Sequence, residues 1–172
     1  MHEGTPGMGE LDTEQQAGVE ALAGVLRSRG MRLATAESCT GGLIAAACTS
    51  LAGSSDWFER GFVTYSNDAK TELLGVPEAL IARHGAVSEP VVRAMAEGAL
   101  QRSSAQRAVA VTGIAGPGGA TPDKPIGMVW VAVARTDGET AALLLQLAGD
   151  RAAVRHQTVT RALRALLASL RA

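Results

Sequence analysis

The sequence has few cysteines and few lysines, and it lacks any long apolar run. Its two cysteines are too few for a disulfide framework. No apolar stretch is long enough to span a bilayer, and the first ten residues lack the basic flank and apolar centre of a signal peptide. The net charge of −1 gives no electrostatic reason to expect a nucleic acid or an anionic membrane as partner. Together these absences predict a cytoplasmic protein.

The shortage of lysine is the most informative absence. Of the 16 basic side chains, 14 are arginine, and only Lys70 and Lys124 are lysine. Arginine keeps its proton, whereas a partly buried lysine can lose it and act as a base. Lys70 stands at the start of a predicted helix and is a candidate base, although a solvated lysine paired with Asp68 or Glu72 explains it equally well. Lys124 lies in a proline-flanked loop and is expected to have no function.

The hydrophobic content of 47% and the length of 172 residues predict one globular domain. We expect a disordered leader over residues 1–11 and a single domain over residues 12–172. Helical and strand-like segments alternate, and Asp137-Gly138 signals a hairpin between the last two strands. The predicted fold is a three-layer α/β/α sandwich with a mixed, mainly parallel sheet. The strands are expected at residues 31–36, 60–65, 107–112, 126–134 and 140–147.

A serine stands at a predicted turn from strand to helix. Ser38 begins the stretch Ser-Cys-Thr-Gly-Gly, in which the backbone N–H groups of Cys39, Thr40, Gly41 and Gly42 could hold a developing oxyanion. A plain helix cap is the alternative for Ser38 or Thr40. Cys39 competes as nucleophile because the same helix start would lower a thiol pKa. Its base would then be His84 or His156.

Two further segments could bind an anion. The glycine-rich loop of residues 113–119 follows a buried strand, and its N–H groups could form a nest for phosphate. Arg151 and Arg155 share a helix face near a helix start, where phosphate is favoured. A bare structural loop and a solvated helix face are the alternatives. The three histidines and two cysteines are scattered without the spacing of metal ligands, so no metal site is expected.

Taken together, these segments resemble one family from about residue 13 to the end of the chain. The matching motifs are TAESCTGG at residues 35–42, AGSSDWFERGFVTYSN at 52–67, Lys70, HGAVSEPV at 84–91, GIAGP at 113–117, KPIGMVW at 124–130 and GDR at 149–151. They are similar to the C-terminal domain of the competence/damage-inducible protein CinA. The stand-alone form of that family is a nicotinamide-nucleotide amidohydrolase.

The resemblance implies a serine/lysine amidohydrolase that needs no cofactor. It assigns the nucleophile to Ser38, the base to Lys70 and a supporting role to Tyr65. The implied reaction converts nicotinamide mononucleotide and water to nicotinate mononucleotide and ammonia. Its partners would be a pyridine nucleotide and a second copy of the chain, with no nucleic acid or membrane. We expect Thr112, Gly113, Ala115, Gly116 and Arg151 to bind the nucleotide.

Two other functions remain open on the sequence alone. The first is a nucleotide-binding or regulatory module without turnover. The second is a serine/lysine amidase for another small amide. An ammonia-release assay across a panel of carboxamides distinguishes both from the implied reaction.

Overall fold

The computed structural model describes residues 10–171. Most of the predicted leader, residues 1–9, therefore lies outside the described part of the chain. Leu11, the last leader residue, packs against the hydrophobic core. Within residues 10–171, no helix combines the length and the apolar character that a membrane span requires.

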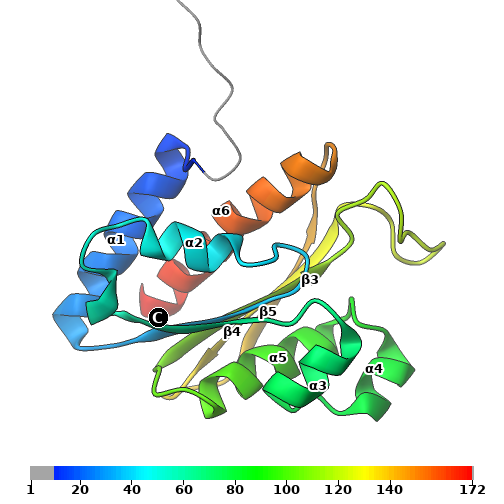
Figure 1. Ribbon diagram of the computed structural model, residues 1–172, viewed down its shortest axis with the longest axis horizontal. Helices are drawn as coiled ribbons and strands as arrows, with labels where there is room; N and C mark the ends of the chain where they lie inside the picture. Colours follow the sequence, from blue (N-terminus) through cyan, green and yellow to red (C-terminus); the bar gives the residue numbers. More distant parts are fainter. Residues whose placement is uncertain (1–9, 172) are drawn as a thin grey trace, which may run out of the picture.

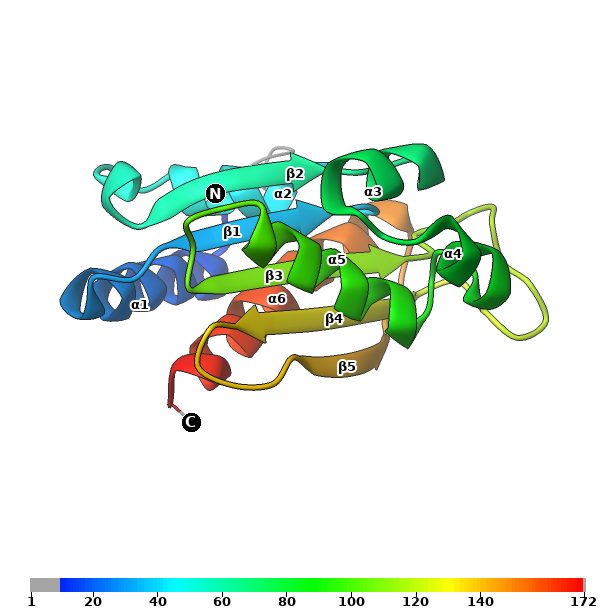
Figure 2. The same ribbon diagram turned by 90° about the horizontal axis from the view of Figure 1, so that it is seen from below.

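The centre of the molecule is a five-stranded sheet with the order β2-β1-β3-β4-β5 (Figure 2). All five strands occur close to their predicted positions: β1 (Leu33–Glu37), β2 (Phe58–Val63), β3 (Arg107–Gly113), β4 (Met128–Arg135) and β5 (Ala141–Gln146). β1 pairs in parallel with both β2 and β3, whereas β4 pairs antiparallel with β3 and β5. The mixed sheet is confirmed. Its parallel and antiparallel pairings are equal in number rather than mainly parallel, because β4 also runs against β3.

Helices cover both faces of this sheet, which confirms the three-layer sandwich (Figure 1). One layer contains α1 (Thr13–Arg29), α2 (Leu43–Thr49) and α6 (Arg151–Arg171), and the other contains α3 (Asn67–Leu74), α4 (Glu78–His84) and α5 (Glu89–Gln101). Capping residues explain several helix boundaries. Asp12 caps α1 through its side chain, Gly30 ends α1 in the left-handed conformation, and Asp150 accepts a hydrogen bond from the N–H of Ala153 in α6.

The two faces of the sheet differ in side-chain size because strand residues alternate between them. Valines of β3 and β4 face α1, α2 and α6 and join a core with the leucines of these helices. Alanines of β1, β3 and β4 face α5. Small side chains let the backbone of α5 approach the sheet closely, and α5 contacts β1, β3, β4 and β5.

The carboxyl ends of β1 and β2 lie at the same edge of the sheet because these strands are parallel. The chain leaves β1 toward β2 on one side, whereas β3 lies on the other side. Such a switch point opens a crevice in α/β sheets and is a preferred position for ligands. Ser38 follows directly after β1, so the fold places it at this point.

Candidate active site

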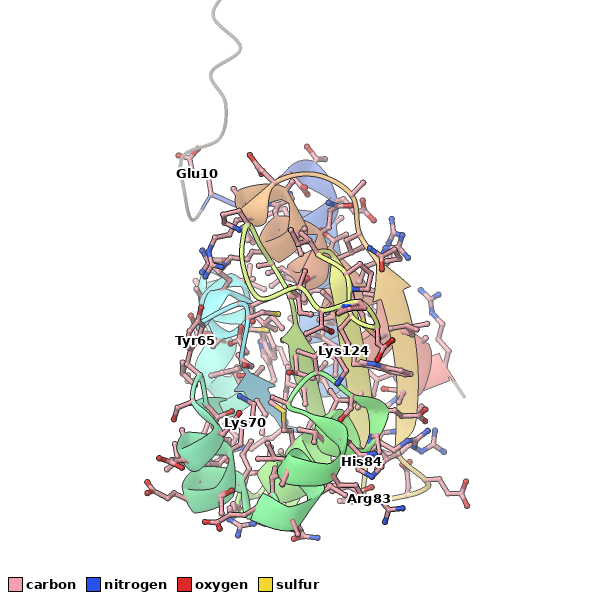
Figure 3. The ribbon with its side chains drawn as sticks, turned by 90° about the vertical axis from the view of Figure 1, so that its right-hand side faces the viewer. Glu10, Tyr65, Lys70, Arg83, His84 and Lys124 are labelled. Atoms are coloured by element: carbon pink, nitrogen blue, oxygen red, sulfur yellow. The ribbon has the colours of Figure 1, made fainter. Side chains whose placement is uncertain are left out.

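Ser38 and Lys70 contact each other directly. The amine Nζ of Lys70 lies 3.0 Å from the Oγ of Ser38. The side chains come from different elements, the turn after β1 and the first turn of α3, which begins after the capping residue Ser66. Figure 3 shows Lys70 beside the end of β1. Both residues are buried, and Lys70 is only 1% exposed. The solvated alternative for Lys70 is therefore wrong.

Burial shifts the Lys70 amine toward its neutral form. Burial lowers the pKa of Lys70, and nearby Cys39 opposes this shift more weakly. The Nζ also lies 2.8 Å from the carbonyl oxygen of Thr64 and 3.4 Å from those of Tyr65 and Ser66. A neutral amine has two N–H donors and one lone pair. If the donors bond to carbonyls, the lone pair is available to accept the proton of Ser38.

Glu37 is a member of this site that the sequence reasoning missed. Its carboxylate is fully buried and accepts hydrogen bonds from the Thr40 hydroxyl at 2.6 Å, the Ile44 N–H at 2.8 Å and the Ala45 N–H at 3.1 Å. It therefore caps α2, whose N-cap residue Gly42 has no side chain for this purpose. The sequence did contain a signal for this role. Glu37 stands directly before Ser38 at the end of a strand, and a glutamate is rarely buried unless its carboxylate is paired or hydrogen-bonded.

Glu37 changes the physical account of the predicted oxyanion site. The N–H groups of Ile44 and Ala45, in the first turn of α2, already bond to its carboxylate. The negative charge of that carboxylate also offsets the positive end of the helix dipole. Any donors for an oxyanion must therefore come from the turn that precedes α2.

Within that turn, the predicted donors separate into two groups. Gly41 is not available, because its N–H donates to the carbonyl oxygen of Ser38 at 3.1 Å. Among the described residues, the backbone N–H groups of Cys39, Thr40 and Gly42 have no protein acceptor. Gly41 and Gly42 both have positive φ, of 59° and 107°, which a side chain would disfavour. The turn thus presents unbonded N–H groups next to Ser38.

Cys39 does not have the properties of a nucleophile. Burial raises the pKa of its thiol to about 11, so the reactive thiolate is scarce at neutral pH. Its side chain belongs to the core on the α6 side of the sheet. Neither histidine proposed as its base is bonded to it: the carbonyl of His84 accepts from Lys124, and the ring of His156 pairs with Asp12.

Arg151 joins two predicted binding segments. It donates to the carbonyl oxygen of Gly116 at 3.0 Å and to the hydroxyl of Tyr65 at 2.8 Å. The ring of Tyr65 is exposed, and Figure 3 shows it farther out than Lys70. Because Lys70 reaches Ser38 directly, no proton relay through Tyr65 is required. Arg151 instead links Tyr65 and the loop of Gly116 into one hydrogen-bonded border.

The other predicted binding residues are more deeply placed. The hydroxyl of Thr112 donates to the carbonyl oxygen of Ala86 at 3.0 Å, and Ala115 is part of the core. Gly113 ends β3, where an added Cβ would come within 2.6 Å of Val129. Thr112 and Gly113 therefore hold the loop in place. Within residues 10–171, no three His, Cys, Asp or Glu side chains gather where they could hold a metal ion.

The fold and this site define an α/β sandwich domain with a buried serine–lysine pair at the carboxyl edge of its sheet. The family model described as "CinA C-terminal domain" matches residues 15–170. The chain belongs to this family, as its motifs predicted.

Relatives and solved structures agree with this assignment. The chain is 57% identical to a CinA-like protein of Akkermansia muciniphila over 83% of its own length and 34% of the relative's, so it spans about a third of that relative. It is 51% identical to the nicotinamide-nucleotide amidohydrolase PncC of Escherichia coli, over 90% of this chain and 94% of that protein. The crystal structure of the competence/damage inducible protein CihA from Agrobacterium tumefaciens is similar with a TM-score of 0.92 and 42% identity, over 95% and 99% of the two chains.

Proposed function

We propose that this chain hydrolyses the carboxamide of nicotinamide mononucleotide to nicotinate mononucleotide and ammonia, with Ser38 as nucleophile and Lys70 as base. The observation that carries the proposal is the 3.0 Å contact between a buried lysine amine and the serine hydroxyl. The similarity to a nicotinamide-nucleotide amidohydrolase along nearly the whole of both chains supports the choice of substrate.

The first half of the reaction forms an acyl-enzyme. Neutral Lys70 takes the proton of the Ser38 hydroxyl while Oγ attacks the carboxamide carbon. The carbonyl oxygen of the substrate then carries the negative charge, and the unbonded N–H groups of Cys39 and Thr40 stabilise it. As the C–N bond breaks, Lys70 gives its proton to the leaving nitrogen, which departs as ammonia. The amine is then neutral again.

The second half reverses these steps with water. Lys70 removes a proton from the water while its oxygen attacks the ester carbon. When the bond to Oγ breaks, the same proton passes from Lys70 to Ser38. The product acid ionises to nicotinate, and the enzyme returns to its starting state. A single lysine thus serves as base and acid in both halves, which requires its pKa to lie well below the ordinary value.

The border formed by Tyr65, Arg151 and the loop of Gly116 would hold the rest of the nucleotide. Arg151 keeps donors beyond those used for Gly116 and Tyr65, and a guanidinium suits phosphate. In the loop of residues 113–119, the N–H groups of Ala115 and Gly116 have no acceptor among the described residues. We assign the phosphate and ribose to Arg151 and this loop. Arg151→Ala should therefore raise KM for the mononucleotide more than for nicotinamide riboside.

The test is an ammonia-release assay on a panel of carboxamides: the mononucleotide, its riboside, nicotinamide and unrelated small amides. Ser38→Ala should abolish release, whereas Cys39→Ala should retain it within a few-fold. Binding of the mononucleotide without ammonia release would favour the regulatory module. Faster release from an unrelated amide would favour a different amidase. Cytoplasmic location and homodimer formation remain predictions, to be checked by fractionation and by light scattering.

A further inference from the structure

Arg155, one helical turn after Arg151, is directed at the serine turn. Its Nε donates to the carbonyl oxygen of Cys39 at 3.1 Å, and its terminal nitrogen donates to that of Thr40 at 3.2 Å. The guanidinium thus joins the start of α6 to the turn after β1, across 115 residues of sequence. The sequence reasoning considered Arg155 only as a partner of Arg151 for phosphate.

The bond to Cys39 has a consequence for the neighbouring N–H group. A peptide unit is planar and trans, so its C=O and N–H point in opposite directions. The carbonyl of Cys39 and the N–H of Thr40 belong to one peptide unit. Because Arg155 holds that carbonyl, the N–H of Thr40 must point away from the guanidinium.

The preceding peptide unit is held in the same manner. The carbonyl oxygen of Ser38 accepts the N–H of Gly41, which fixes the direction of the Cys39 N–H. By contrast, within the described residues nothing bonds to the carbonyl oxygen of Gly41, which shares a peptide unit with the N–H of Gly42. The two N–H groups proposed for the oxyanion are therefore those whose opposite ends are anchored.

We propose that Arg155 is a positioning residue: it fixes and polarises the Cys39–Thr40 peptide so that the Thr40 N–H stabilises the oxyanion. The cationic bond on the carbonyl also makes the N–H of the same peptide a stronger donor, since linked hydrogen bonds strengthen one another. This inference takes its substrate from the proposed function. The role of Arg155 in stabilising an oxyanion does not depend on which amide is hydrolysed. Arg155 and Arg151 thus have different tasks although they share a helix face.

The experiment compares Arg155→Ala with Arg161→Ala, a matched change at an exposed position of the same helix. For the mononucleotide, Arg155→Ala should lower kcat about ten- to a hundredfold, somewhat less than the loss of a whole oxyanion donor. KM should stay within about twofold, and the pH midpoint should not move, because Lys70 is untouched. Arg161→Ala should match the wild type. A raised KM with unchanged kcat would overturn the proposal and make Arg155 a phosphate ligand.

A second measurement does not depend on the identity of the substrate. A small fluorophosphonate reacts with an activated serine through a similar anionic transition state, and mass spectrometry follows the adduct on Ser38. Arg155→Ala should slow this labelling by about the same factor as kcat. If the wild type is labelled but releases no ammonia from the mononucleotide, the proposed function fails while this inference is still tested. A labelling rate equal to that of Arg161→Ala would overturn the inference.

Arg155→Lys covers the case in which Arg155→Ala does not fold. A lysine keeps the positive charge but cannot hold two carbonyls in the planar geometry of a guanidinium. We expect labelling and kcat to fall by roughly three- to tenfold, between the wild type and the alanine variant. Rates equal to those of the wild type would show that the bonds to the turn have no catalytic effect.

Discussion

The only two lysines of the chain occupy opposite kinds of environment. Lys70 is 1% exposed and lies against Ser38 and three backbone carbonyls. Lys124 is half-buried on the loop between β3 and β4, and it donates to the carbonyl oxygen of His84 at the end of α4. The surroundings of Lys70 lower the pKa of its amine. Lys124 instead places its amine at the C-terminal end of α4, where the helix dipole is negative. In a chain that otherwise uses arginine, only Lys70 occupies a position where losing the proton is useful.

The strongest test of this comparison exchanges each lysine for arginine. Lys70→Arg should reduce ammonia release by about three orders of magnitude or more, because a guanidinium does not deprotonate and cannot act as base. Lys124→Arg should retain the wild-type rate, since arginine can also donate to the His84 carbonyl. The measurement is steady-state release of ammonia from the mononucleotide. An active Lys70→Arg enzyme would remove the base assignment.

The pH profile gives the next largest effect. Only neutral Lys70 can accept the serine proton, so kcat/KM should rise about tenfold per pH unit below the pKa of Lys70 and level off above it. Since burial lowers that pKa, the midpoint should lie below the ordinary lysine value of about 10.4. Lys124→Ala should leave the midpoint unchanged. A midpoint at or above the ordinary value would contradict the role of burial.

A smaller effect concerns stability. Because the pKa of Lys70 is lower in the folded state, the unfolded chain binds more protons between the folded and unfolded values, and stability rises with pH across that window. Below it, the buried amine costs stability. Lys70→Met should therefore stabilise the inactive protein at neutral pH by about 1 kcal/mol, as is common when a functional site is removed. Thermal unfolding should show a Tm higher by roughly 2–4 °C. A lower Tm would mean that the bonds of the amine outweigh its burial.

The sequence was sufficient for the fold because its local signals agree with one another. Asp12 and Gly30 bracket α1 with residues typical of helix ends, and alternating valine and alanine define β3 and β4. The proportion of parallel pairing was harder to predict. Which strand lies beside β3 depends on how the long loop after Gly113 returns, and no local pattern records that.

For the site, the sequence predicted the residues better than their contacts. Ser38 and Lys70 are 32 positions apart, and only the parallel pairing of β1 with β2 brings them together. Glu37 and Arg155 were undervalued because each acts on backbone groups, Glu37 on N–H groups of α2 and Arg155 on carbonyls of the serine turn. The identity of a residue does not show which backbone groups it will contact. Which N–H groups are unbonded likewise depends on hydrogen bonds that form only in the folded turn.

An effect of similar size on stability, with none on kcat, is expected from removing Lys124. Its amine bond to His84 fastens the loop between β3 and β4 to the end of α4, and the loop also closes on itself through paired backbone bonds between Thr121 and Lys124. Because those backbone bonds survive the change, Lys124→Ala should cost only about 0.5–1.5 kcal/mol, the usual net value of one hydrogen bond. Thermal unfolding should show a Tm lower by a few degrees, with kcat unchanged. The same loop contains Gly116. A clear rise in KM would therefore mean that the Lys124–His84 bond also holds the nucleotide-binding border in place. The two lysines would then serve one site, Lys70 at the reacting serine and Lys124 at the binding loop.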